Sequence, residues 1–449
     1  MFKNNKILIL GFARSGYEAA KVLAKRGNDI VVTDGKSNHN QEKIKELEDL
    51  GVRFVLGENP IELVDKSVNY LIKNPGVPIN HEYVVKAREL NIEVINEVEM
   101  AYRLFPEGIK LIGITGTNGK TTTTTLIYEM IKKDGKSVYL TGNIGFPLCS
   151  FLDKLNKDDI VVMETSCQQL ENLYRFKPDI AIMTNLFEAH IDFFNTYDAY
   201  KKVKAKIFKN HTEDDIAILN IENEDVISVT KDIKSKVRYF SSNKEINGCY
   251  IKDAAIYYYE EKIVDLSDIK LVGYHNYENI MASILVVKEL GVSNESIVSL
   301  LKEFGGVEHR VEFVRELNKR RFYNDSKATN ITSTQIALSA FNDSTIIILG
   351  GMERGQDFNE LKDYMKNVKF IVCYGECRDR IKEFGDSLGI ETKVFDNLRE
   401  AINSSYDLSS EDDVILLSPC AASWDQYKDF EERGNEFKQI VNELEWWYE

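Results

Sequence analysis

The amino-acid sequence predicts an α/β protein with a Rossmann-like N-terminal domain, a central P-loop ATPase domain and a C-terminal Rossmann-like α/β domain. Short apolar runs alternate with helical patterns along the chain, which favours parallel sheets covered by helices. Several of these runs end in glycine-rich or polar loops, where the strands of such sheets bind their ligands. The length of 449 residues suits roughly three domains. We place them at residues 1–96, 97–306 and 307–449.

The first block has the outline of a nucleotide-binding βαβ unit. Lys6–Leu10 is expected to form a buried strand that enters the turn Gly11–Gly16. A helix is expected from Tyr17 to Lys25. A second strand covers Ile30–Thr33 and ends at Asp34, where an acid can hold a ribose hydroxyl.

Two details of this block qualify that outline. Ala13 replaces the middle glycine of the G-x-G-x-x-G motif, the glycine that lets the backbone approach a pyrophosphate, so the sequence argues against ordinary dinucleotide binding. A second loop, Lys73–Pro78, follows the expected strand Tyr70–Ile72. In a sheet of this type that loop can line the same crevice.

A phosphate-binding loop is the most informative motif. Ile112–Thr121 stands between a short apolar run and a helical pattern, which is the order of strand, loop and helix that such a loop needs. Lys120 would reach the β- and γ-phosphates, and the Thr121 hydroxyl would bind Mg²⁺. The residues expected to bind the nucleotide here are Gly116, Thr117, Asn118, Gly119, Lys120 and Thr121. Ile114 occupies the first glycine position of G-x-x-x-x-G-K-[ST], so the match is a variant, and the alternative is a glycine-rich turn with an incidental lysine.

Polar residues also follow later strands. The expected buried strand Ile160–Glu164 delivers a carboxylate where a second magnesium-associated acid belongs. Another strand, Ile180–Asn185, leads toward His190. In the third block, further strands are expected at residues 344–349, 370–374 and 413–417.

Composition excludes several classes of protein. The formal net charge of −15 argues against non-specific nucleic-acid binding, which needs a basic face. No N-terminal run has the length of a signal peptide's apolar region, and no apolar stretch is long enough for a bilayer, so we expect a cytoplasmic protein without membrane insertion. The six cysteines form no C-x-x-C pair and are expected to be reduced structural thiols, although Cys373 and Cys377 can share a helical face.

Several segments, in their order along the chain, resemble the Mur ligase family of ATP-dependent amide ligases. They include the phosphate-binding loop, Glu164–Ser166, Asn185–Asp192 and the lysine-rich stretch Tyr200–Lys204. The others are Gly142–Gly145, Gly273–Asn279, Glu308–Arg310, Asn324–Asn330 and Ser418–Ser423. The N-terminal block and the run Ser423–Gly434 are most similar to the members that add D-glutamate to UDP-N-acetylmuramoyl-L-alanine.

The resemblance implies a reaction and a set of residues for it. A substrate carboxylate would be activated by ATP as an acyl phosphate and then attacked by an amine, with two Mg²⁺ ions in the site. The implied catalytic residues are Lys120, His190, Lys204 and Lys327. The implied metal ligands are Thr121, Glu164, His190 and Lys204, the last as a carbamylated lysine. Without the resemblance, Lys204 would pass for one of several surface lysines.

The resemblance also assigns binding residues to the other two blocks. Asn276, Asn279, Arg310 and Asp325 would contribute to ATP binding. The implied residues for UDP-N-acetylmuramoyl-L-alanine are Ser15, Asp34, Lys36, Gly76 and Asn143. Those for D-glutamate are Thr329, Arg354, Ser423 and Phe430. The family suggests a monomer.

Three alternative functions stay open on the sequence. The chain could be a related ligase that adds a different amino acid. It could be a NAD-dependent oxidoreductase built on the first block, against which Ala13 and the lack of a recognisable hydride-transfer site count. It could be a non-catalytic nucleotide-binding regulator, against which the joint presence of Lys120, Glu164, His190 and Lys204 counts.

Overall fold

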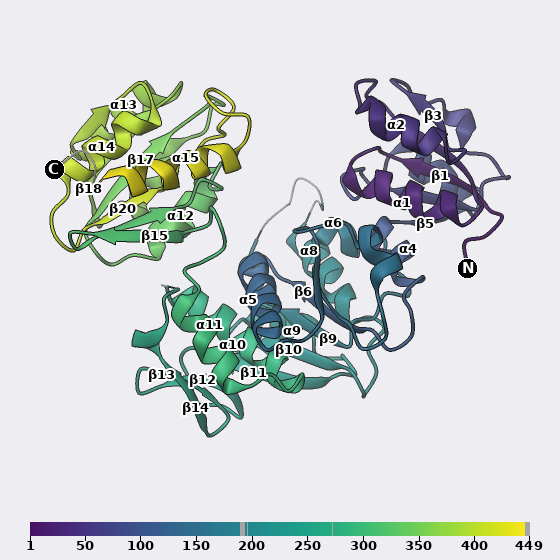
Figure 1. The fold of residues 1–449 in the computed structure, drawn as a ribbon, viewed down its shortest axis with the longest axis horizontal. Coiled ribbons are helices and arrows are strands. Elements are labelled where there is room, and N and C mark those ends of the chain that lie inside the picture. Colours follow the sequence, from purple (N-terminus) through teal and green to yellow (C-terminus); the bar gives the residue numbers. More distant parts are fainter. Residues whose placement is uncertain (189–193, 195, 272, 445–449) are drawn as a thin grey trace. The chain divides into compact units, whose positions relative to one another are not determined.

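A computed structural model describes residues 1–188, 194, 196–271 and 273–444 (Figure 1). It contains sheets of five, nine and six strands, taken in chain order. Contacts between residues divide the chain into two compact units. Unit 1 comprises Met1–Val264 and Glu278–Leu300, and unit 2 comprises Asp265–Tyr277 and Leu301–Glu449. The mixed α/β architecture with three sheet-containing regions agrees with the fold class that the sequence predicts.

The first sheet has the strand order β3-β2-β1-β4-β5, and its described pairs are parallel. Its strands are β1 (Lys6–Leu10), β2 (Asp29–Asp34), β3 (Arg53–Leu56), β4 (Tyr70–Lys73) and β5 (Glu93–Ile95). The helices are α1 (Arg14–Lys25), α2 (Gln41–Glu48), α3 (Glu82–Glu89) and α4 (Glu97–Tyr102). Alternate residues of β1 pack on opposite faces, Ile7 and Ile9 with residues of α1 and α2, Leu8 and Leu10 with residues of α3. The chain reverses direction across the sheet between β1 and β4, which makes their carboxyl ends the binding crevice of such a fold.

The second sheet has the order β14-β13-β12-β11-β10-β9-β6-β8-β7. Its strands are β6 (Lys110–Thr115), β7 (Val138–Gly142), β8 (Ile160–Glu164), β9 (Ile180–Met183), β10 (Ile216–Asn220), β11 (Lys236–Ser241), β12 (Gly248–Lys252), β13 (Ala255–Tyr258) and β14 (Glu261–Asp265). The helices are α5 (Lys120–Lys133), α6 (Cys167–Leu170), α8 (Tyr197–Ala205), α9 (Glu224–Val229), α10 (Tyr274–Glu289) and α11 (Asn294–Glu303). Strands β7, β8, β6 and β9 are neighbours and parallel, so their carboxyl ends share one edge. Beyond β12 the sheet continues with an antiparallel pairing to β13, which the sequence did not indicate.

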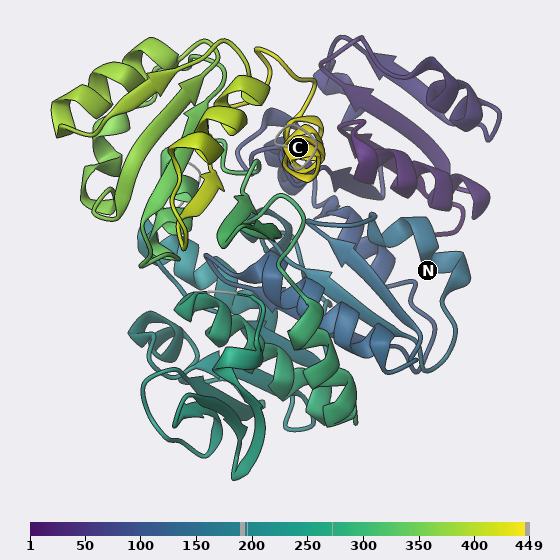
Figure 2. The same ribbon diagram turned by 60° about the vertical axis from the view of Figure 1, so that its left-hand side comes forward.

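The third sheet has the order β15-β16-β20-β17-β18-β19. Its strands are β15 (Glu312–Leu317), β16 (Arg320–Asn324), β17 (Thr345–Gly350), β18 (Val368–Tyr374), β19 (Thr392–Val394) and β20 (Val414–Leu417). The helices are α12 (Ile331–Ser339), α13 (Arg378–Leu388), α14 (Leu398–Leu408) and α15 (Phe430–Glu443). Helices α12 and α13 pack on one face of this sheet and α14 and α15 on the other. Figure 2 shows this part of the chain in green and yellow.

Helix α4 joins the first and second sheets within unit 1. The Asn96 side chain, which caps this helix, donates to the Gln169 carbonyl at 2.6 Å. The Glu97 carboxylate accepts the Cys149 N–H at 2.6 Å, and the Glu99 carboxylate accepts the N–H groups of residues 174–176. These three side chains are buried, so the connection between the two sheets is a packed joint.

Some local expectations were wrong. Helix α1 begins at Arg14, three residues before the expected start, because its first turn is made by residues of the glycine-containing motif. Cys373 lies in β18 and Cys377 precedes α13, so they do not share a helical face. All six cysteines are free and buried, as expected. Over the described residues, no helix is both long and apolar enough to cross a membrane.

Candidate active site

The phosphate-binding loop leaves the carboxyl end of β6 and enters α5. Gly116 and Gly119 have positive φ angles of 146° and 79°, which glycine adopts readily and other residues do not. A Cβ atom on Gly119 would lie 2.1 Å from Oδ1 of Asn279. The first turn of α5 begins at Lys120, and the free N–H groups of a helix start favour an anion there. The loop therefore has the backbone shape that the sequence predicted for phosphate binding.

Lys120 curls back over this loop. Its ammonium group donates to the carbonyl oxygens of Thr117 at 2.8 Å and Gly116 at 3.1 Å. The N–H groups of Thr117 and Asn118 donate to Asn185, which follows β9, at 2.9 and 2.8 Å. These two N–H groups hold the loop to its neighbouring strand in this structure. The N–H groups at the start of α5 and the Lys120 ammonium are then the main positive groups of the loop.

Glu164 ends β8 next to the loop and is buried. Its Oε1 accepts a hydrogen bond from the Asn143 side chain at 3.0 Å. Its Oε2 is buried, and within the described residues it has no hydrogen-bond partner. A buried carboxylate oxygen left without a donor is costly, and a cation is one group that satisfies it. Asn143 thus touches the predicted metal ligand directly.

Lys204 departs from the ordinary behaviour of a lysine. It lies in α8 and only 1% of it is exposed. Its ammonium group donates to the Gly116 carbonyl at 2.7 Å and lies 5.0 Å from the ring centre of Tyr200. Burial, reinforced by the nearby charge of Lys120, lowers the pKa of Lys204 to about 7. The surface position suggested by its lysine-rich neighbourhood is wrong, because Lys204 is buried.

Four further residues were predicted at or near this edge: Thr121, Asn279, Asn276 and His190. Thr121 is buried in the first turn of α5. Asn279 lies in α10, where its Oδ1 accepts the Thr123 hydroxyl at 3.2 Å. Asn276 is one turn earlier in the same helix and is also buried. His190 lies outside the described residues.

In the first sheet, the predicted residues occupy the crevice at the ends of β1, β2 and β4. The Asp34 carboxylate accepts the N–H groups of Phe12 at 2.7 Å and Lys36 at 2.9 Å, which leaves it capacity for a further donor. Lys36 itself is exposed. From the other side, the Asn74 side chain donates to the Ser15 hydroxyl at 3.2 Å. This contact places the two loops side by side, as a shared crevice would require.

The Asn74 side chain also organises its own loop. Its Oδ1 accepts the Gly76 N–H at 3.1 Å. Gly11 packs so closely on Asn74 that an added Cβ would lie 2.9 Å from the Asn74 Cβ. Ser15 and Gly76, both predicted to bind the substrate, are therefore linked through one amide side chain.

In unit 2, the predicted residues follow the ends of the adjacent parallel strands β16, β20 and β17. Asp325 is buried and accepts hydrogen bonds from the Val311 N–H at 3.2 Å and the Ser418 hydroxyl at 2.8 Å. Burial raises the pKa of Asp325 to about 7, against the lowering effect of Ser418 and Arg310. The Lys327 ammonium lies 5.4 Å from the ring centre of Phe430.

The residues implied for amino-acid binding lie on the same edge of the third sheet. Arg354 is exposed in the loop after β17, and its guanidinium lies 5.6 Å from the ring centre of Trp424. Ser423 is buried after β20, Phe430 begins α15, and Thr329 follows β16. The edge is thus cationic at Lys327 and Arg354, which suits an acidic ligand.

Sequence reasoning missed three buried residues beside these loops. Arg433 is fully buried and donates to the carbonyl oxygens of Ser326, Gly350 and Ala421, which lie at or after the ends of three different strands. The Tyr200 hydroxyl lies 3.0 Å from the Thr117 hydroxyl. Lys73 lies under the loop that carries Asn74 and Gly76. In each case the sequence shows a charged or aromatic residue within or beside a motif, but it does not show that the residue is buried.

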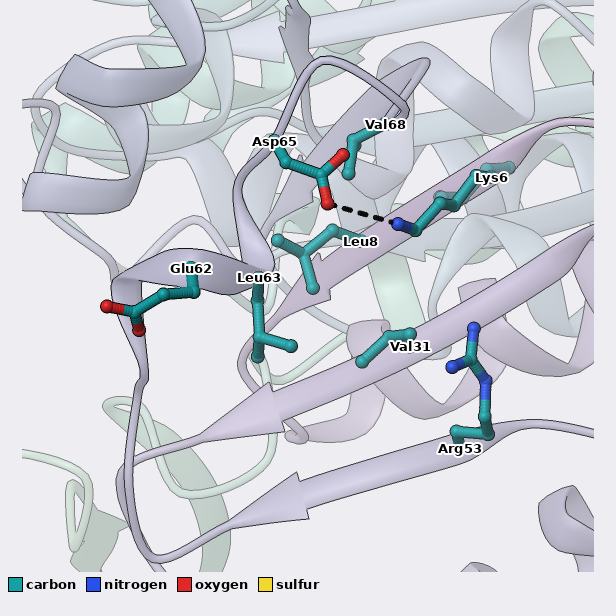
Figure 3. A pocket seen from close by; sticks show the side chains of 9 residues that line it. Lys6, Leu8, Val31, Arg53, Glu62, Leu63, Asp65 and Val68 are labelled. Carbon is teal, nitrogen blue, oxygen red and sulfur yellow. Dashed lines mark hydrogen bonds and ion pairs between the residues drawn. The ribbon is translucent and has the colours of Figure 1, made fainter.

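A separate pocket lies on the first sheet (Figure 3). It is lined by apolar side chains of β1, β2 and the segment before β4, with Lys6 and Arg53 at its rim. Lys6 pairs with Asp65 at 3.3 Å, and Arg53 pairs with Asp29 at 2.8 Å. The pocket extends over the first half of β1 and the middle of β2, away from the carboxyl ends of these strands. It contains none of the predicted residues.

Comparison with known proteins identifies the class. Three family models match in order: the Mur ligase MurD-like N-terminal domain over residues 5–96, the Mur ligase middle domain over 114–287, and the Mur ligase glutamate ligase domain over 309–421. The chain belongs to the Mur ligase family. It is 45% identical, over 99% of its length and 98% of the relative's, to the UDP-N-acetylmuramoylalanine--D-glutamate ligase of Bacillus thuringiensis (strain Al Hakam).

Solved structures agree on the fold. The UDP-N-acetylmuramate-alanine ligase MurC of Thermotoga maritima matches with a TM-score of 0.58 at 19% identity, over 98% of this chain and 99% of that one. The MurF ligase of Thermotoga maritima, solved in complex with ADP, matches with a TM-score of 0.55 at 17% identity, over 98% and 96% of the two chains. At these identities the likeness supports the three-domain Mur ligase architecture and no finer property.

Proposed function

We propose that this chain joins D-glutamate to UDP-N-acetylmuramoyl-L-alanine at the expense of ATP, as a step of peptidoglycan precursor synthesis. The observation that carries the proposal is the 45% identity, over almost the whole chain, to a ligase named for that reaction. The site supports it because a phosphate-binding loop, a buried acid and a buried lysine share one edge of the second sheet. A related ligase that takes another amino acid is the remaining alternative.

The chemistry explains why positive charge gathers at this edge. Direct formation of an amide from a carboxylate would expel hydroxide or oxide, both poor leaving groups. Transfer of the γ-phosphoryl group to the substrate carboxylate makes an acyl phosphate, from which an attacking amine displaces phosphate. Two anions must approach each other in the first step, so cationic groups are needed around them. We assign this role to the Lys120 ammonium and the start of α5.

The side chains at the edge fit a divalent cation. Glu164 offers a buried oxygen that lacks a donor in the described part of the chain, and Thr121 offers a hydroxyl in the adjacent turn. Oxygen ligands of this kind suit Mg²⁺. We assign Thr121 and Glu164 to the ATP-side ion, and His190 with Lys204 to a second one. Bound there, Mg²⁺ would neutralise charge on the phosphates and the carboxylate.

Lys204 must change chemically to serve as a ligand. An ammonium group repels a cation, but a carbamate formed from the neutral amine and CO₂ is an anionic oxygen ligand. Because burial lowers the pKa of Lys204 to about 7, a much larger share of it than of an ordinary lysine would be the reactive neutral amine near neutral pH. We propose that Lys204 is carbamylated in the working enzyme.

The remaining assignments follow the family resemblance and the positions of the loops. We assign Asn276, Asn279, Arg310 and Asp325 to ATP, and Lys327 to the reacting phosphate. Ser15, Asp34, Lys36, Gly76 and Asn143 are assigned to the UDP-sugar, and Thr329, Arg354, Ser423 and Phe430 to D-glutamate. We keep the domain boundaries 1–96, 97–306 and 307–449, a cytoplasmic location and a monomeric state as parts of the proposal.

The direct test is phosphate release from ATP with Mg²⁺, UDP-N-acetylmuramoyl-L-alanine and bicarbonate. D-glutamate, L-glutamate, L-lysine and no amino acid are compared. Release that requires D-glutamate is the expected result. Release with a different amino acid would keep the reaction class and overturn the assigned amino acid. No release with any of them would contradict the proposal as a whole.

The carbamate has its own test. Intact-protein mass spectrometry under non-acidic conditions should show one added CO₂ on the wild type in bicarbonate buffer. The Lys204→Met variant should lack it, and the Lys202→Met variant, which removes a neighbouring lysine from the same helix, should retain it. An unmodified wild-type chain that is fully active would contradict this part of the proposal.

A further inference from the structure

Lys73, the last residue of β4, is buried although it carries an ammonium group. Only 1% of it is exposed. The ammonium donates to the carbonyl oxygens of Val77 at 2.8 Å, Asn74 at 3.3 Å and Pro75 at 3.5 Å. Among the described residues, no carboxylate forms an ion pair with it. One cation therefore gathers three carbonyl groups of the short loop that follows its own strand.

Burying the Lys73 ammonium costs folding free energy, so its presence needs an explanation. Burial lowers the pKa of Lys73 to about 8, with Glu171 favouring the charged form and Arg88 opposing it. The backbone carbonyls compensate only in part for the lost hydration of the ammonium. A methionine or leucine would fill the same space without that cost, so the charge itself is the feature to explain.

The three hydrogen bonds fix the direction in which the loop presents its other groups. The Asn74 N–H donates to the Leu10 carbonyl at 2.9 Å, and the Val77 N–H donates to the Asn74 carbonyl at 3.0 Å. With carbonyls turned inward to Lys73, the Asn74 side chain is left to hold the Gly76 N–H and the Ser15 hydroxyl. Lys73 thus lies behind a network whose front consists of two residues assigned to the UDP-sugar.

We propose that Lys73 is a positioning residue for the uridine diphosphate part of the substrate. Its ammonium fixes the loop of residues 74–77 in the binding shape and adds a buried positive charge behind the site of a doubly charged ligand. This inference rests on the proposed function, because that function places the nucleotide at Ser15 and Gly76. It adds a residue that makes no contact with the ligand and acts through the loop.

Preorganisation of the loop and the positive charge of the Lys73 ammonium both act on substrate binding and not on the chemical step. Removal of Lys73 should therefore weaken the binding of one substrate and leave that of the others unchanged. In Lys73→Met, the Kd for UDP and the KM for UDP-N-acetylmuramoyl-L-alanine should rise roughly tenfold or more. The KM values for ATP and D-glutamate, and kcat, should stay within about threefold. Lys66→Met, which removes an exposed lysine of the same sheet's connections, should behave like the wild type.

A pH series on the unmodified protein provides a readout that needs no variant. Binding of UDP, measured by calorimetry, should weaken as pH rises through about 8, because Lys73 then loses its proton. In Lys73→Met the Kd should be high at all pH values and flat across this range. A merely structural contribution of the side chain would not produce a pH dependence that the substitution removes.

The outcomes discriminate between this inference and the function on which it rests. A folded Lys73→Met variant that binds UDP with the wild-type Kd would overturn the role of Lys73 and leave the function intact. So would a wild-type Kd that does not change between pH 7 and pH 9, even if the variant fails to fold. A wild-type protein that does not bind UDP at all would overturn both.

Discussion

The ammonium group of Lys204 lies 2.7 Å from the carbonyl oxygen of Gly116. Helix α8 thereby reaches the phosphate-binding loop through a buried lysine, in addition to the Tyr200 hydroxyl beside Thr117. The same loop receives the Lys120 ammonium, so two lysines converge on the Gly116 carbonyl. Their mutual repulsion is one reason why the pKa of Lys204 falls.

The first prediction concerns the stability cost of Lys204. Its pKa is about 7 in the fold and 10.5 ordinarily, so between these values the unfolded chain binds more protons. Stability of the wild type should therefore rise with pH across this range, relative to a variant without the amine. Lys204→Met should have the higher melting temperature at pH 7 in CO₂-free buffer, with a gap that narrows toward pH 9, and should lack ligase activity. A gap that widens with pH would contradict the assigned pKa.

The second prediction concerns Glu164. Glu164→Gln keeps the acceptor for Asn143 but removes the charge of the oxygen that lacks a donor in the described structure. If Glu164 is a metal ligand, the Mg²⁺ concentration for half-maximal activity should rise by roughly 10- to 100-fold. Glu213→Gln, at an exposed position of the same sheet's connections, is the control. A Mg²⁺ dependence unchanged from the wild type would rule out Glu164 as a ligand.

The third prediction separates two effects of a glycine in the phosphate-binding loop. Gly119 and Gly135 have nearly equal φ angles of 79° and 80°, but only Gly119 faces a side chain that an added Cβ would meet, Asn279. Gly135→Ala should cost only the backbone strain, about 1 kcal/mol of unfolding free energy. Gly119→Ala should cost more and should also weaken ATP binding. Denaturant unfolding and nucleotide titration measure the two effects, and equal costs would show that the Asn279 contact is unimportant.

The fourth prediction is a stabilising substitution. Burial raises the pKa of Glu97 to about 7 from 4.5, so as pH rises the unfolded chain releases this proton first and the wild type loses stability between these values. Glu97→Gln keeps an acceptor for the Cys149 N–H and removes the buried charge. At pH 8 it should be more stable by up to about 3 kcal/mol, with little difference at pH 4.5. Glu107→Gln, an exposed neighbour, should show no such pH dependence.

Much of the fold could be predicted because apolar runs and their loop residues are local signals. The strands Lys6–Leu10 and Ile160–Glu164 have the expected bounds. The antiparallel pairing of β12 with β13 was missed, since a strand's direction depends on its partners and not on its own residues. The start of α1 was missed because the glycine of a motif can also occupy a helical turn.

The candidate site was predictable where a residue sits inside a motif that follows a strand. Parallel order then brings Thr121, Glu164 and Asn143 to one edge. Lys204 and Lys73 show what a local sequence pattern cannot predict, which is burial. A lysine looks exposed in any sequence of charged neighbours, and only the packing of other segments decides that it is buried.

The joint at α4 has a consequence for how such a chain can be cut or recombined. Asn96, Glu97 and Glu99 each place their polar atoms among main-chain groups of the central region. A fragment ending at residue 96 would leave the Gln169 carbonyl without its donor and the Glu99 N–H without its capping acceptor, since Asn96 supplies both, and a transplanted N-terminal region would need an equivalent side chain there. The first region can therefore be exchanged between relatives only where Asn96 keeps its two partners, Gln169 and Glu99, so evolution and engineering must treat these three positions as one inherited part.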